Sequence, residues 1–163
     1  MAAPAPDRFS ASKAWLRALE LTARIEREPQ RTLPVVIDEL AARFGNAPAL
    51  LSDRGRLSFG ELAGRVNAIA RWARTQGLAG KTVCLLMNNA PDYLAIWLGI
   101  TRIGGVVALL NTNLRGAALA HCIKVAASDH MIVGADLQNV LAEALAETRI
   151  SATIWVHGSS TTP

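Results

Sequence analysis

The chain contains 163 residues, 51% of them hydrophobic and 18% charged, with a formal net charge of +4. A chain of this size and apolar content can bury one core, which excludes a fully disordered chain and fits a single domain or part of a larger one. The positive charge comes mostly from arginines interleaved with acidic residues, so no nucleic-acid-binding face is expected. The longest apolar stretch, residues 93–110, is interrupted by Arg102 and Gly104-Gly105, so a membrane-spanning helix is not expected either.

The cysteines and the N-terminal residues indicate the cellular compartment in which the protein is expected. Cys84 and Cys122 lack a CxxC spacing, so neither a disulfide framework nor a zinc site is predicted. The first residues carry no charged segment followed by an apolar run, unlike a secretory signal. We expect a cytoplasmic protein with two buried thiols.

The N-terminal segment predicts an amphipathic helix over residues 10–28 that ends before Pro29. Trp15 and Leu19 lie on its apolar face, with lysine and arginine side chains around them. Two placements are open for this helix. It either binds an acidic membrane surface peripherally or, because its acidic residues weaken that attraction, packs on the protein body. We interpret residues 1–32 as a helical extension.

The main domain is predicted to begin with a helix, the two strands of a hairpin and a second helix: residues 33–44, 49–52, 56–59 and 58–77. Gly55 supplies the turn of the hairpin. Ser58 and Glu61 have the spacing of a capping box, which places the start of the second helix.

From residue 82 onward, strands and helices alternate. The predicted strands cover residues 82–87, 105–110, 130–133 and 152–156. The predicted helices cover residues 91–103, 114–126 and 136–147, the last opened by Asp136. Strands that are apolar on both faces and alternate with helices imply right-handed crossovers. The fold class is therefore predicted to be α/β, with a mostly parallel sheet covered by helices.

Phosphate-binding loops are the usual site in such a fold. The turn after the first of these strands, residues 87–92, has no glycine, so a dinucleotide site of the Rossmann type is not expected. Residues 99–105 have the glycine spacing of a P-loop but lack its Lys-Ser/Thr, and we interpret them as a helix end that leads into a strand. Asn88 and Asn89 are interpreted as caps of the helix that begins at Pro91.

The histidines and cysteines predict no catalytic or metal-binding residue. His121 and Cys122 are adjacent on a helix and point about 100° apart, which disfavours a nucleophile and base pair. His130 and His157 border strands without a partner at a metal-ligand spacing. Residues 159–163 lack the interior glycine and the following lysine of a phosphate loop, and residues 158–163 are interpreted as a frayed or truncated tail.

Four segments carry a family resemblance. Residues 57–62, LSFGEL, are similar to a family segment LTYxEL, and residues 80–93, GKTVCLLMNNAPDY, to GDxVALLLPNSPEY. Both patterns resemble the N-terminal region of the AMP-forming acyl-CoA synthetases, the adenylate-forming superfamily. Residues 97–99 and 111–116, WLG and NTNLRG, are similar to its fatty acid transport protein branch, the very-long-chain acyl-CoA synthetases.

The resemblance implies a fold, a reaction and a set of cofactors. Residues 33–157 would be the incomplete N-terminal part of the large domain of such an enzyme. In the implied reaction, a fatty carboxylate attacks the α-phosphate of ATP to give an acyl-adenylate and pyrophosphate. The thiol of CoA then displaces AMP. ATP, Mg²⁺ and CoA are the implied cofactors, and a fatty acid is the implied substrate.

The residues that perform this chemistry in the family have no counterparts among these 163 residues. The glycine-rich YTSGTTGxPK loop, the metal-holding glutamate, the ribose-binding aspartate, the hinge and the C-terminal lysine are all missing. Tyr93 and Trp97 are candidates to lie near an acyl path. We expect an N-terminal fragment that is inactive without the remaining C-terminal part. The alternative is a non-catalytic α/β module that binds a lipid or a protein partner.

Overall fold

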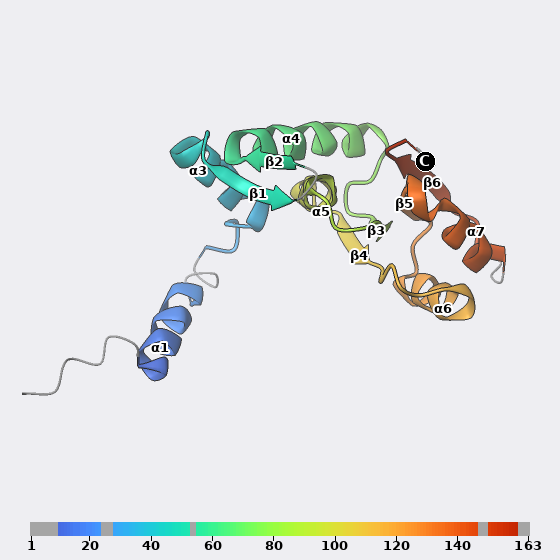
Figure 1. Ribbon diagram of the computed structural model, residues 1–163, viewed down its shortest axis with the longest axis horizontal. Coiled ribbons are helices and arrows are strands. Elements are labelled where there is room, and N and C mark those ends of the chain that lie inside the picture. The colour runs from blue at the N-terminus through green and yellow to red at the C-terminus, as the bar shows by residue number, and fades with distance from the viewer. Residues whose placement is uncertain (1–9, 24–27, 53–54, 147–149, 160–163) are drawn as a thin grey trace, which may run out of the picture. The chain divides into compact units, whose positions relative to one another are not determined.

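The computed structural model describes residues 10–23, 28–52, 55–146 and 150–159 (Figure 1). The chain divides into two compact units, Met1–Thr32 and Leu33–Pro163.

The described helix of the first unit, α1 (Ala11–Thr22), is shorter than predicted. Residues 24–27 of the predicted helix lie outside the described residues, and Glu28 is not helical. The hydroxyl of Thr22 donates to the carbonyls of Ala18 and Leu19, at 2.9 and 3.1 Å. Such bonds compete with continued helix hydrogen bonding, which favours an end at this point.

The second unit begins with the predicted helix, hairpin and helix: α3 (Leu33–Phe44), β1 (Pro48–Ser52), β2 (Gly55–Ser58) and α4 (Phe59–Thr75). The strands β1 and β2 pair antiparallel. The predicted capping box is confirmed, because Ser58 Oγ accepts from the Glu61 amide at 3.2 Å and Glu61 Oε2 accepts from the Ser58 amide at 2.8 Å. These hydrogen bonds to Ser58 lower the pKa of Glu61.

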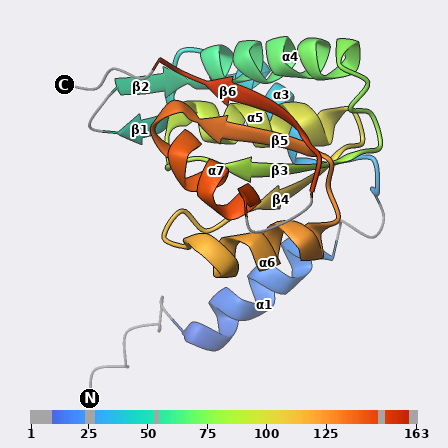
Figure 2. The same ribbon diagram turned by 90° about the vertical axis from the view of Figure 1, so that its right-hand side faces the viewer.

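The α/β prediction is confirmed by a four-stranded sheet in which every pair of neighbours is parallel. Its strands are β3 (Thr82–Leu86), β4 (Val106–Leu109), β5 (His130–Gly134) and β6 (Thr153–His157). The order across the sheet is β4-β3-β5-β6, as Figure 2 shows. The crossover helices are α5 (Pro91–Arg102), α6 (Gly116–Ala126) and α7 (Gln138–Ala146).

Helices cover both faces of this sheet, with α4 and α5 on one side and α6 and α7 on the other (Figure 1). Side chains alternate along each strand, so β3 sends Val83 and Leu85 to the first face and Cys84 and Leu86 to the second. A further apolar cluster joins α3, α4, α5 and β2 around Val66. The two central strands, β3 and β5, are therefore buried on both sides, as their apolar sequences predicted, whereas the edge strands β4 and β6 are partly exposed.

Two helix starts differ from prediction. The helix α6 begins at Gly116 rather than at residue 114, because the preceding turn satisfies its own polar groups. Asn111 Oδ1 accepts from the Asn113 amide at 2.9 Å, and the Arg115 guanidinium donates to two carbonyls of the turn. Before α7, Ala135–Leu137 form a 3-10 turn.

The interpretation of residues 99–105 as a helix end is confirmed. Gly104 has a left-handed φ of 79° and donates its amide to the Thr101 carbonyl at 3.0 Å. The Gly105 amide donates to the Ile100 carbonyl, also at 3.0 Å. This pair of bonds is a Schellman motif, which explains the two glycines without a phosphate.

Candidate functional site at the carboxyl end of the parallel sheet

The strand order creates a topological switch between β3 and β5. The helix α5 leaves β3 on one face of the sheet, and α7 leaves β5 on the other. In open α/β sheets, the carboxyl ends of two such strands border the crevice in which ligands bind. The side chains at the carboxyl ends of β3, β5 and β6 are therefore the candidates for a binding site.

A hydrogen bond bridges the switch point. Asn88, which follows β3, donates from Nδ2 to Oδ2 of Asp136, which follows β5, at 2.7 Å. A Cβ at Gly134 would lie 2.7 Å from Asp136 Oδ1, so a larger residue there would displace the Asp136 carboxylate. The bridge draws Asn88 and Asp136 toward each other across the carboxyl ends of the two strands.

This bridge corrects two predictions. The N-cap of α5 is Ala90, and no side chain caps the helix, so the interpretation of Asn88 and Asn89 as caps is wrong. Asp136 does not open α7 with a side-chain cap either, because its carboxylate accepts from Asn88. Pro91 does occupy the first turn of α5, as predicted.

A second cluster of polar side chains joins three elements at the same edge. The Asp92 carboxylate, in the first turn of α5, forms an ion pair through Oδ1 with Arg65 of α4. Its Oδ2 lies 3.1 Å from Nε2 of His157, the last residue of β6. The three side chains line a hollow of about 110 Å³ together with apolar residues of α4 and α5, among them Ile69 and Ile96.

The surroundings of Asp92 favour its charged form. Burial alone would raise the pKa of this carboxyl, but the hydrogen bond and charge of Arg65, and then those of His157, outweigh it and lower the pKa. The start of α5 adds a favourable helix dipole. A carboxylate held in this way positions the end of β6 against α4 and α5.

Sequence reasoning missed the Asp92–His157 contact, because 65 residues separate the partners. The one available signal was topological. Both residues were predicted at the carboxyl side of a parallel sheet, where the ends of successive strands meet.

The predicted candidates Tyr93 and Trp97 lie elsewhere on α5. Both are partly buried and pack against the core cluster between the sheet and the helices α4 and α5. Burial raises the pKa of Tyr93. Neither lines the hollow beside Asp92. The acyl-path assignment of Tyr93 and Trp97 stays a prediction.

The surroundings of His121, Cys122 and Cys84 do not indicate a catalytic role. His121 is exposed, whereas Cys122 packs against the core under α6. Cys84 is fully buried in β3, and burial raises the pKa of its thiol. Across residues 10–23, 28–52, 55–146 and 150–159, no three His, Cys, Asp or Glu side chains gather as a metal site.

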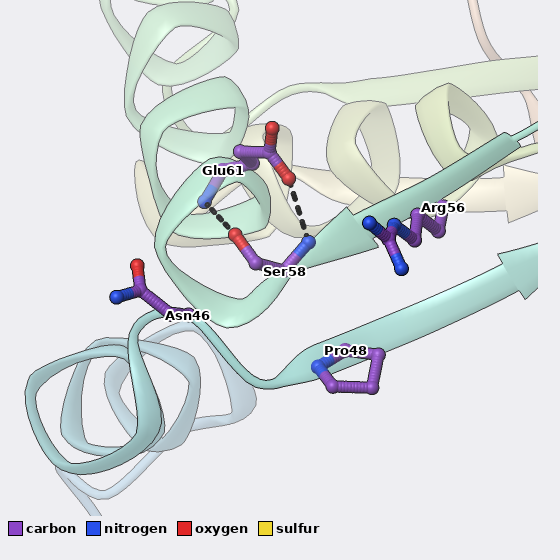
Figure 3. A pocket seen from close by; sticks show the side chains of 5 residues that line it. All are labelled: Asn46, Pro48, Arg56, Ser58 and Glu61. Carbon is purple, nitrogen blue, oxygen red and sulfur yellow. Dashed lines mark hydrogen bonds between the residues drawn. The ribbon is translucent and has the colours of Figure 1, made fainter.

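Among the described residues, two further hollows of note lie away from this edge. One, of about 420 Å³, is lined by the turn after α3, the hairpin and the start of α4 (Figure 3). Its polar groups include the capping box of Ser58 and Glu61, and Arg56. The other, of about 240 Å³, is lined by Arg71 and Arg74 of α4 and by Arg102 of α5. The Arg102 guanidinium is already paired with Asp38 of α3.

Comparison with known proteins identifies the family of this chain. The profile of the family described as "AMP-binding enzyme" matches residues 37–162. The chain belongs to the AMP-binding enzyme family. Human long-chain fatty acid transport protein 6 is 41% identical over 76 residues, which are 47% of this chain and 12% of that protein. Mouse long-chain fatty acid transport protein 1 is 31% identical over 128 residues, 77% of this chain and 20% of that protein.

Solved structures share this fold. The N-terminal domain of FACL13 from Mycobacterium tuberculosis aligns with a TM-score of 0.71 at 21% identity, over 77% of this chain and 33% of that one. The luciferase-like enzyme of the mealworm Zophobas morio aligns with a TM-score of 0.73 at 16% identity, over 80% of this chain and 32% of that one. The chain thus corresponds to part of the AMP-binding domain and spans 12 to 20% of the length of these transport proteins.

No helix in the described part of the chain is both long enough and apolar enough to cross a membrane.

Proposed function

We propose that this chain is the N-terminal part of a long- or very-long-chain fatty acyl-CoA synthetase and that it is inactive alone. The observation that carries the proposal is the family match over residues 37–162 together with relatives named as long-chain fatty acid transport proteins. The full enzyme would convert a fatty acid, ATP and CoA to acyl-CoA, AMP and pyrophosphate. In this proposal, residues 1–32 form a helical extension, residues 33–157 the α/β portion and residues 158–163 a tail.

The part played by this chain would be to position the active site. The carboxyl ends of β3, β5 and β6 carry Asn88, Asp136 and His157, and the family's ATP site would form beyond such an edge. ATP, Mg²⁺ and CoA belong to the whole enzyme, and no residue of this chain is assigned to hold them. Tyr93 and Trp97 remain proposed neighbours of an acyl path.

The outer strands support the idea that further chain completes this domain. Ile154 and Val156 of the edge strand β6 are 42% and 48% exposed, and Val106 of the opposite edge strand β4 is 59% exposed. Apolar side chains on open sheet edges are usually covered in a folded enzyme. We infer that the remaining C-terminal part of a synthetase would cover this apolar surface.

The compartment follows from the same proposal. Both cysteines are free thiols, which fits a reducing cytoplasm, where ATP and CoA are available. A peripheral membrane contact would bring the enzyme to its poorly soluble fatty acid substrate.

A pyrophosphate exchange assay tests the proposal. The native gene product is incubated with ATP, labelled pyrophosphate and a long-chain fatty acid, beside the 163-residue chain alone. We expect fatty-acid-dependent exchange from the native product and none from the 163 residues. Exchange by the 163 residues, or its absence from the native product, would contradict the proposal.

The alternative function is a non-catalytic module that uses the exposed apolar side chains of β4 and β6 to hold a lipid or a partner. Stoichiometric binding of a fluorescent fatty acid by the 163-residue chain, with no exchange activity from the native product, would favour this module over the synthetase.

A further inference from the structure

The N-terminal helix α1 has its charged side chains on one narrow side. Its twelve residues include three charges, Lys13, Arg17 and Glu20. At about 100° per residue, these three lie within about 60° of one another around the helix axis. The other nine residues are alanines, leucines, one tryptophan, one serine and one threonine. An arc of about 220° thus carries no charge and has Trp15 near its centre, with Ser12 and Thr22 as its polar residues.

No side chain of α1 is buried. The four large apolar side chains are well exposed, at 66% for Trp15, 59% for Leu16, 47% for Leu19 and 57% for Leu21. A helix of twelve residues is only marginally stable by itself in water. Its N-cap, Ser10, adds no side-chain hydrogen bond. The helix therefore needs a surface that covers its apolar side.

The width of the apolar arc favours lipid as that surface. A helix that packs on a protein face needs an apolar stripe of roughly 100°, whereas one partly immersed in a bilayer surface is covered around much of its circumference. Trp15 suits the boundary between head groups and acyl chains, since its ring is apolar and its indole N–H is a donor. A length of about 18 Å lets α1 lie along this boundary but not span the bilayer.

The net charge of the N-terminal segment favours an anionic lipid. Lys13 and Arg17 lie on the polar side, where their alkyl stems can follow the apolar surface while the charged ends reach the head groups. The sequence of residues 1–32 holds six Lys and Arg against four Asp and Glu, a net +2. This sign matches an anionic head-group layer.

We propose that α1 binds an anionic lipid surface, lying parallel to it with Trp15 at the boundary between head groups and acyl chains. The inference does not rest on the proposed function, because α1 lies outside the family-matched residues 37–162.

Vesicle binding by the full 163-residue chain tests the proposal. Vesicles of phosphatidylcholine alone are compared with vesicles that also contain phosphatidylserine, at low and high salt. We expect cosedimentation mainly with the anionic vesicles, weakened by salt. Trp15→Ala should lower the partition coefficient by at least about tenfold, from the apolar area lost. Trp15→Phe should keep most of the binding but lose most of the blue shift in tryptophan emission that accompanies it.

A matched pair of variants distinguishes binding through the apolar side of α1 from nonspecific adsorption of the chain to vesicles. Leu19→Glu places a negative charge on the apolar side of α1, and Leu51→Glu places the same charge on β1, where Leu51 is 76% exposed. Leu19→Glu should abolish vesicle binding, and Leu51→Glu should leave it intact. Thermal melts followed by circular dichroism check that both variants remain folded.

Three results would overturn the proposal. The first is the absence of binding to anionic vesicles by the unmodified chain, whether sedimentation velocity shows a monomer or a dimer. The second is equal loss of binding in Leu19→Glu and Leu51→Glu. The third is a blue shift that persists in Trp15→Phe.

Discussion

Gly99 lies within α5, where this helix packs closely against α4. A Cβ at position 99 would lie 2.6 Å from Cγ2 and 2.7 Å from Cβ of Ile69, and 3.0 Å from the Val66 carbonyl oxygen. The Cβ of Ile69 and the backbone oxygen cannot rotate away. Gly99→Ala should therefore push the two helices apart.

The expected change in the unfolding free energy of Gly99→Ala is the difference between two opposing effects. Overpacking of a tight contact costs about 2–3 kcal/mol when the neighbours are rigid. Alanine is favoured over glycine in a helix by about 1 kcal/mol, which offsets part of that cost. The net expectation for Gly99→Ala is a loss of about 1–2 kcal/mol, or about 4 °C in melting temperature per kcal/mol.

Gly64 supplies the matched control for Gly99→Ala. It also lies within a helix, α4, but it is exposed, and a Cβ there would meet no atom within 4 Å. Gly64→Ala should raise the unfolding free energy by about 0.5–1 kcal/mol from helix propensity and the less flexible unfolded chain. Urea denaturation of both variants measures the difference. Stabilisation of similar size in both would refute the close approach of α4 and α5.

Two further predictions concern the polar side chains of the same unit. Ser58→Ala removes the capping box with Glu61 and should cost about 1 kcal/mol in urea denaturation, with loss of α4 helicity as the first change; an unchanged midpoint would contradict the cap. Asp92→Asn removes the ion pair with Arg65 and weakens the contact with His157. The folded-state pKa of Asp92 is lowered, so its stabilisation is complete above the unfolded value of 3.8 and disappears as pH falls through the folded value. The urea midpoint of Asp92→Asn should therefore lie below that of the unmodified chain at pH 7 and approach it in strong acid, and a gap that persists there would contradict the ion pair.

The order of helices and strands could be predicted from the sequence because each signal is local. The Ser58–Glu61 spacing, the proline at the start of α5 and the apolar alternation in β3 depend on neighbours in the chain. The role of the glycines in residues 99–105 could also be predicted, since this helix end needs a left-handed residue, which is Gly104.

The side-chain contacts of the site depend on the fold and could not be predicted in the same way. Asn88 looked like a cap because asparagine commonly fills that role, but the partner of its side chain, Asp136, is 48 residues away. The contact between Asp92 and His157 likewise requires the register of β6 beside β5. Spacing in the sequence carries no information on such pairs until the strand order is known.

We propose that these 163 residues are one part of a larger acyl-activating enzyme. The most direct test is the intact mass of the native gene product. We expect a mass several times 17.4 kDa, since the chain spans 12 to 20% of its relatives' length. A stable native product of 17.4 kDa would contradict it.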